Sequence, residues 1–162
     1  AIRGLLPFFD LPMSSFKQGD KDQALLKIEK DNTLFLIAPF ICYEIVYPEF
    51  VADMASQSDM LITISNDAWF GDSLGPKQHM AIAQMRALET QRNLLRSTNT
   101  GITALVNHKG EIVKQLPTQQ RATLTALAET RQGSTPFMLI GLWPLFIATL
   151  LILTFGFYRR RS

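Results

Sequence analysis

The stretch Thr33-Leu34-Phe35-Leu36-Ile37-Ala38-Pro39-Phe40-Ile41, followed at once by Cys42-Tyr43-Glu44, decides how the chain is organised. Its nearly continuous apolar character predicts a strand buried on both faces of a sheet. Met60 to Ile64 is a second short apolar run, rich in β-branched residues, and predicts a neighbouring strand. Between them, Pro48 to Ala55 predicts a short helix with proline near its start. The order strand, helix, strand favours a layered α/β fold.

The rest of the chain extends this alternation. Apolar residues at helical spacing predict a long helix from Pro76 to Arg96. Ile102 to Val106 and Ile112 to Leu116 flank the turn formed by residues 107–110 and predict a β-hairpin. Two further strands are expected at Leu25–Ile28 and Ala122–Ala128. We therefore expect an α/β domain over residues 1–131.

Composition excludes several classes of protein. The 162 residues are 47% hydrophobic and 19% charged, which is typical of about one folded domain. The net charge of +2 comes from Arg159 to Arg161, because residues 1–131 hold thirteen basic and fourteen acidic groups. No nucleic-acid footprint is therefore expected. Cys42 is the single cysteine, so the chain has no internal disulfide.

The last quarter has a different character. Gln132 to Tyr158 is a run of 27 residues without a charge. As a helix rising about 1.5 Å per residue, it exceeds a hydrocarbon core of roughly 30 Å. The sequence predicts a transmembrane helix over residues 136–157, and Arg159 to Arg161 place the tail, residues 158–162, on the cytoplasmic side. A buried core helix is the alternative.

Cys42 is the first candidate for chemistry. A thiol at the end of a buried strand is held by the sheet while the following turn exposes it. It could attack an acyl carbonyl, with the backbone N–H of Tyr43 facing the developing oxyanion. Glu44 is a carboxylate two residues on. The alternatives are an inert buried cysteine and a surface or salt-bridged acid.

A second loop, Ser65 to Gly71, follows the next predicted strand. Asn66 and Asp67 at a strand end are typical of a simple Asx turn. Trp69 and Phe70 are adjacent aromatic residues that could shape a pocket for an acyl chain. Because both loops leave neighbouring strands, they are expected to converge on one site.

Taken together, these motifs resemble the nitrilase superfamily, and within it the apolipoprotein N-acyltransferase family. The resemblance rests on Cys42-Tyr43-Glu44, Ser65-Asn66-Asp67-Ala68-Trp69-Phe70-Gly71, His79, Arg86-Ala87-Leu88-Glu89 and Arg96-Ser97-Thr98-Asn99-Thr100-Gly101-Ile102. It runs from about Leu6 to the C-terminus. It implies the C-terminal part of a nitrilase-like α-β-β-α sandwich followed by one membrane helix, about the final third of such a protein.

The resemblance also implies roles for individual residues. The family uses a Glu-Lys-Cys triad, in which Cys42 matches the nucleophile. The Glu and the Lys of the triad would precede residue 1. Lys17 and Lys30 do not match the position of the triad Lys. Tyr43 would supply a backbone donor to the oxyanion and Glu44 would support the site.

The loop and helix residues receive roles in the same way. Asn66, Trp69 and Phe70 match the loop lining the acyl pocket. Arg86 and Glu89 match a structural pair three residues apart on one helix face. His79 is expected at a helix surface or cap.

The implied reaction is two-step acyl transfer. Cys42 would take an acyl chain from the sn-1 ester of a phospholipid and pass it to the α-amino group of the diacylglyceryl-cysteine of an apolipoprotein. The resemblance implies no cofactor and no metal, a monomer in the bacterial inner membrane, and a periplasmic catalytic domain. Two alternatives stay open: a membrane-tethered amidase or nitrilase-type hydrolase, and an inactive fragment that lacks the triad Glu and Lys.

Overall fold

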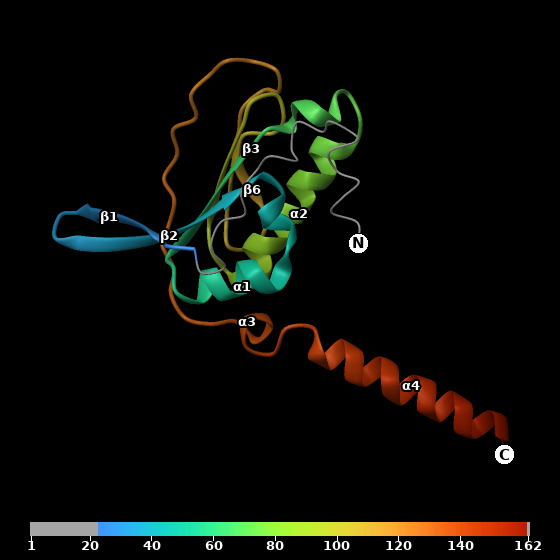
Figure 1. Ribbon diagram of the computed structural model, residues 1–162. Helices are drawn as coiled ribbons and strands as arrows, with labels where there is room; N and C mark the ends of the chain where they lie inside the picture. Colours follow the sequence, from blue (N-terminus) through green and yellow to red (C-terminus); the bar gives the residue numbers. More distant parts are fainter. Residues whose placement is uncertain (1–22, 162) are drawn as a thin grey trace, which may run out of the picture.

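The computed structural model describes residues 23–161. The sheet strands are β1 Leu26–Lys30, β2 Thr33–Ile41, β3 Met60–Ser65, β4 Leu94–Thr98, β5 Ala104–Val106 and β6 Ile112–Gln115. The α-helices are α1 Pro48–Ser56, α2 Gly75–Thr90, α3 Pro136–Ile140 and α4 Trp143–Arg161, and two 3₁₀ helices are η2 Cys42–Val46 and η3 Asp67–Phe70. Figure 1 shows this order along the chain.

The strands form one six-stranded sheet in the order β1-β2-β3-β4-β5-β6. The three central strands β2, β3 and β4 are parallel, so their carboxyl ends lie at the same edge. The outer pairs are antiparallel, and β5 and β6 form the hairpin expected from the sequence. The mixed α/β fold is thereby confirmed, as are the strands predicted from Thr33 and from Met60.

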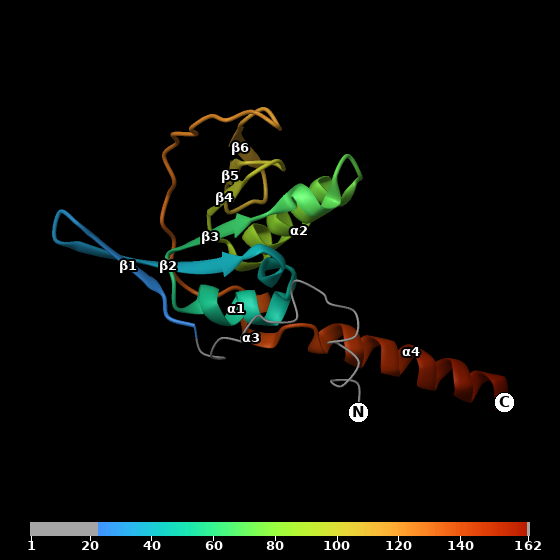
Figure 2. The ribbon, with the colours of Figure 1, turned by 45° about the horizontal axis from the view of Figure 1, so that its top comes forward.

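Helices α1 and α2 cover one face of the sheet, and Figure 2 shows α1 beneath β2. The core between them contains fully buried side chains from β2, β3 and both helices: Phe40, Val51, Leu61, Met80 and Ala87. Along β3, Leu61, Thr63 and Ser65 face this core, while Ile64 on the other face is 61% exposed. Thr63 and Ser65 therefore point toward the helices.

The long helix ends earlier than predicted. The sequence pattern extends it to Arg96, but α2 stops at Thr90 because Gln91 adopts a left-handed conformation with φ of 49°. Leu94 to Thr98 then forms β4, which pairs in parallel with β3. Leu94 and Leu95 continue the helical spacing of apolar residues, but they lie in the central strand β4.

The strand predicted at Ala122–Ala128 is wrong, because this segment pairs with no strand. Its side chains alternate between half-buried and exposed, as in an extended chain. Lys114 in β6 donates from Nζ to the carbonyl oxygen of Thr125 at 2.9 Å, but no backbone ladder forms. The alternation alone did not distinguish a strand from an extended connection.

The apolar C-terminal region forms two helices in place of one. Gly141 has a positive φ of 54° and separates α3 from α4. Within residues 23–161, no helix combines the length and apolar character needed to cross a membrane. The buried-core alternative is wrong, since α4 points away from the body in Figure 1 and side chains such as Leu150 and Ile152 are 62% and 71% exposed.

The described residues contain one sheet of the expected sandwich and one layer of helices against it. The segment Leu5–Phe16, whose aromatic and proline residues suit either a substrate-gating segment in the outer leaflet or a covered loop, lies outside the described residues, as does Lys17.

Candidate active site

The carboxyl ends of β2, β3 and β4 meet around a pocket of about 550 Å³. Parallel strands of an α/β sheet commonly present functional groups at this edge. The pocket is lined by Ile41 and Cys42 after β2, Ile64, Ser65 and Asn66 at the end of β3, and Ser97, Thr98 and Asn99 at the end of β4. The two loops that the sequence predicted to converge therefore do so, and the loop after β4 joins them.

Cys42 occupies a sharp turn between β2 and η2. Its φ of 52° is unusual for a residue other than glycine and is maintained only where the surroundings hold it. The residue is half-buried, and its sulfur lies 3.4 Å from the hydroxyl oxygen of Ser65. A strained strand-to-helix turn of this kind projects a nucleophile out of the sheet edge.

Glu44 stabilises that turn. Its Oε2 accepts a hydrogen bond from the backbone N–H of Ile41 at 2.7 Å, and its Oε1 accepts from the side chain of Gln23 at 3.0 Å. Tyr43 lies between Cys42 and Glu44 in the first turn of η2, where helix N–H groups lack intrahelical acceptors. The structure thus brings all three residues together, with Glu44 bonded to the turn itself.

Behind Cys42 lies a buried polar cluster, which we call the Asp67 network: Ser65, Asp67, His79 and Arg96. Asp67 Oδ1 accepts from the Ser65 hydroxyl at 2.7 Å and Oδ2 from Arg96 Nη2 at 2.8 Å. His79 lies 3.2 Å from both Asp67 and the main-chain oxygen of Cys42. The expectation that His79 sits at a helix surface or cap is wrong, because it is only 4% exposed.

Burial is the main influence on Arg96 and lowers the pKa of its guanidinium. The negative charge of Asp67 and its hydrogen bond with Arg96 oppose this lowering of the Arg96 pKa. Because an arginine side chain keeps its proton in proteins, Arg96 places a positive charge near the thiol.

The three residues expected to bind the acyl chain have different surroundings. Asn66 lines the Cys42 pocket; its Oδ1 accepts from the backbone N–H of Ala68 at 3.2 Å, as in an Asx turn, and from Asn99 Nδ2 at 2.6 Å. Trp69 is 73% exposed. Phe70 packs edge to face on His79 at 6.2 Å. The aromatic residues stand beside the pocket and do not line it.

Arg86 and Glu89 form the pair expected on one face of α2, with 3.0 Å between Nη2 and Oε1. Burial raises the pKa of Glu89, while the Arg86 charge opposes that shift. Burial likewise lowers the pKa of Arg86. The charge of Glu49 in α1 also acts on Arg86, and the hydroxyl of Thr135, which precedes α3, donates to the main-chain oxygen of Glu89 at 2.6 Å.

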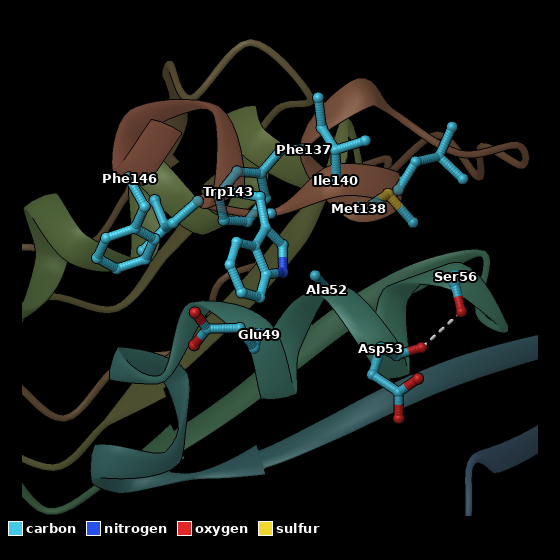
Figure 3. A pocket seen from close by; sticks show the side chains of 12 residues that line it. Glu49, Ala52, Asp53, Ser56, Phe137, Met138, Ile140, Trp143 and Phe146 are labelled. Carbon is cyan, nitrogen blue, oxygen red and sulfur yellow. Dashed lines mark hydrogen bonds between the residues drawn. The ribbon is translucent and has the colours of Figure 1, made fainter. Parts of the chain in front are cut away.

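A separate groove of about 440 Å³ lies between α1 and the α3–α4 region (Figure 3). Apolar side chains including Phe137, Trp143 and Phe146 form one wall, while Glu49 and Asp53 of α1 lie opposite. It shares no residue with the Cys42 pocket. Among residues 23–161 no group of three or more His, Cys, Asp or Glu side chains is arranged to hold a metal ion.

Fold and site together define an α/β protein with a candidate cysteine nucleophile at the carboxyl edge of a mixed sheet. The chain belongs to the carbon-nitrogen hydrolase family, whose model matches residues 10–132. It is 51% identical over 161 residues to an apolipoprotein N-acyltransferase of Azotobacter vinelandii and 48% identical over 164 residues to one of Photobacterium profundum. These matches cover 99% of this chain but 30% and 31% of those relatives.

Solved structures resemble the same part of the fold. An amidase from Nesterenkonia sp. AN1 matches with a TM-score of 0.51 and 17% identity, over 65% of this chain and 41% of that one. In that structure an acetamide moiety is covalently added at the active-site cysteine of the amidase. At this level of identity the likeness shows the nitrilase-like fold.

Proposed function

We propose that this chain carries the cysteine nucleophile of an apolipoprotein N-acyltransferase, which transfers an acyl chain from a phospholipid to the N-terminal diacylglyceryl-cysteine of apolipoproteins. The observation that carries the proposal is the 51% identity across 99% of the chain to a relative of that name. The position of Cys42 supports the chemistry, because a half-buried thiol on a strained turn opens into a pocket.

In the first step the Cys42 thiolate attacks the sn-1 ester carbonyl of a phospholipid such as phosphatidylethanolamine. A carbon–sulfur bond forms, and the carbonyl electron pair becomes an oxyanion that the Tyr43 N–H stabilises. Collapse breaks the ester carbon–oxygen bond and leaves a thioester. The lysophospholipid alkoxide takes the proton that the Cys42 thiol first gave to the triad Glu, which the family resemblance makes the general base.

In the second step the α-amino group of the acceptor attacks the thioester. The new carbon–nitrogen bond makes an amide, the carbon–sulfur bond breaks, and Cys42 returns as thiolate. The proton that the amine loses passes to the triad Glu, the general base that the family resemblance implies. Trp69 and Phe70 are proposed to contact the acyl chain beside the pocket.

We further propose that the α3–α4 region lies in a bacterial inner membrane, with residues 1–131 on the periplasmic side and the basic tail on the cytoplasmic side. Support comes from large apolar side chains of α4 that no other part of the described chain covers, including Leu145, Phe146 and Leu151 at 60–62% exposure. Arg159 and Arg160 follow this apolar surface. The enzyme is proposed to act as a monomer.

A membrane-tethered hydrolase is the second candidate, because this fold is shared with an amidase that has an active-site cysteine. In that candidate, water takes the place of the amine as acyl acceptor. The test uses a hybrid protein in which this chain replaces the matching segment of the Azotobacter vinelandii relative. The hybrid is given phosphatidylethanolamine vesicles and a peptide bearing an N-terminal diacylglyceryl-cysteine. N-acylated peptide, identified by mass, supports the transferase; free fatty acid without peptide acylation supports the hydrolase.

A further inference from the structure

The strained backbone of Cys42 has a buried partner. The Nε2 atom of His79 lies 3.2 Å from the main-chain oxygen of Cys42. A carbonyl oxygen only accepts, so Nε2 carries the hydrogen and donates. This contact joins α2 to the turn that presents the thiol.

Two charged groups hold His79 in this orientation. Its Nδ1 lies 3.1 Å from Arg96 Nη2 and 3.2 Å from Asp67 Oδ1. Nδ1 therefore accepts a hydrogen from Arg96 or, when protonated, donates to Asp67. Both neighbours are buried, at 2% and 1% exposure, so water competes little for these contacts.

The same network reaches the sulfur by a second route. The Ser65 hydroxyl oxygen lies 2.7 Å from Asp67 Oδ1 and 3.4 Å from Cys42 Sγ. Its single hydrogen can point to either group. Asp67 retains Arg96 as a charged partner when that hydrogen turns toward the sulfur.

We propose that His79 is a positioning residue that fixes the Cys42 turn for acyl transfer through its Nε2–H bond to the Cys42 main-chain oxygen, with Asp67 and Arg96 setting its orientation. The inference rests on the proposed function. A backbone conformation as unusual as that of Cys42 persists only when its surroundings determine it. His79 fixes the turn on the carbonyl side of Cys42, and Glu44 fixes it on the Ile41 side.

The experiment measures the single-turnover rate constant and the burst amplitude of Cys42 thioester formation in the hybrid protein, with phosphatidylethanolamine vesicles. The amplitude counts correctly folded sites, whereas the rate constant reports how well each folded site is positioned. His79→Phe keeps a ring but loses the donor, and we expect its rate constant to fall on the order of 10- to 100-fold. His79→Gln keeps an N–H near the Nε2 position and is expected within about threefold of wild type.

His108→Phe, in the β5–β6 turn, is the matched control and is expected to match wild type. If His79→Phe gives no burst, His79→Asn replaces it, because the shorter amide does not reach the Nε2 position. If the variant without the donor forms the thioester with the wild-type rate constant, the inference is overturned, whatever the burst amplitude. The inference is also overturned if His79→Gln is as slow as the variant without the donor. Absence of a thioester in wild type overturns the proposed function itself.

Discussion

The sulfur of Cys42 and the hydroxyl oxygen of Ser65 lie 3.4 Å apart, at the carboxyl ends of two paired parallel strands. The register of β2 and β3 places Ile41 opposite Ile64, one residue before each of them. Backbone pairing therefore sets the distance between the proposed nucleophile and the buried Asp67 network. Changes that disturb either the turn or the network are expected to affect Cys42 chemistry.

Glu44→Ala should weaken the Cys42 turn. The substitution removes the acceptor for the Ile41 N–H, and losses of comparable side-chain caps cost about 1 kcal/mol. Glu44→Gln keeps one carbonyl oxygen and should cost less. Thermal unfolding of the chain in detergent measures this, with Glu29→Ala on the exposed strand β1 as control. Equal melting temperatures for Glu44→Ala and the control would contradict the role given to Glu44.

Gly101→Ala should disrupt the Asp67 network. A Cβ at Gly101 would overlap the Asp67 carboxylate, which is buried and tied to Arg96. Because that carboxylate has little room to move, we expect a loss of about 2 kcal/mol or more in the free energy of unfolding. Gly156→Ala meets no atom within 4 Å and is the matched control. Similar stability for the two variants would show that the network tolerates displacement.

The half-buried Glu89 should give the protein a pH-dependent stability. Its pKa is raised from 4.5, so the folded state binds this proton more tightly than the unfolded state. The favourable contribution is complete below about pH 4.5 and is lost as pH rises through the folded pKa. Thermal unfolding of wild type and Glu89→Gln should therefore show the variant gaining relative stability from pH 4 toward neutrality. A difference independent of pH would contradict this.

Helix α4 should hold the chain on lipid. Leu150→Arg combined with Leu151→Arg places two charges on its exposed apolar surface, and each charge is costly in a hydrocarbon core. We expect the variant to lose co-flotation with phospholipid vesicles. Leu127→Arg alters a side chain that is 98% exposed and lies outside α4, so it should float like wild type. Flotation of the double variant would contradict a membrane position for α4.

Much of the fold follows from local patterns. The apolar run from Thr33 predicted the strand β2, and the turn at residues 107–110 predicted the hairpin. Burial of β2 on both faces is not found within residues 23–161, where Leu34 and Ile41 are 54% and 70% exposed. The end of α2 was not predictable from periodicity, because Leu94 and Leu95 suit either a helix or a central strand. Only pairing with β3, which is a tertiary contact, decides between them.

The site was predicted in part. Cys42, Tyr43 and Glu44 follow from their place after a buried strand, whereas the Asp67 network was missed. Its members are spread over β3, η3, α2 and β4, and each alone is typical of a turn or surface residue. The sequence did contain one signal for this network. Asp67 and Arg96 lie near the ends of adjacent strands, and a charged side chain that is buried there needs an oppositely charged partner.

The most direct test of the account is the intact mass of the hybrid protein after incubation with phosphatidylethanolamine vesicles, compared with its Cys42→Ala variant, before and after hydroxylamine. If Cys42 carries the acyl chain, the mass of the parent hybrid increases by one fatty-acyl group. Hydroxylamine removes this increase, and the Cys42→Ala variant does not show it. An unmodified parent hybrid, or an adduct that persists in Cys42→Ala, would contradict the claim that Cys42 carries the acyl chain.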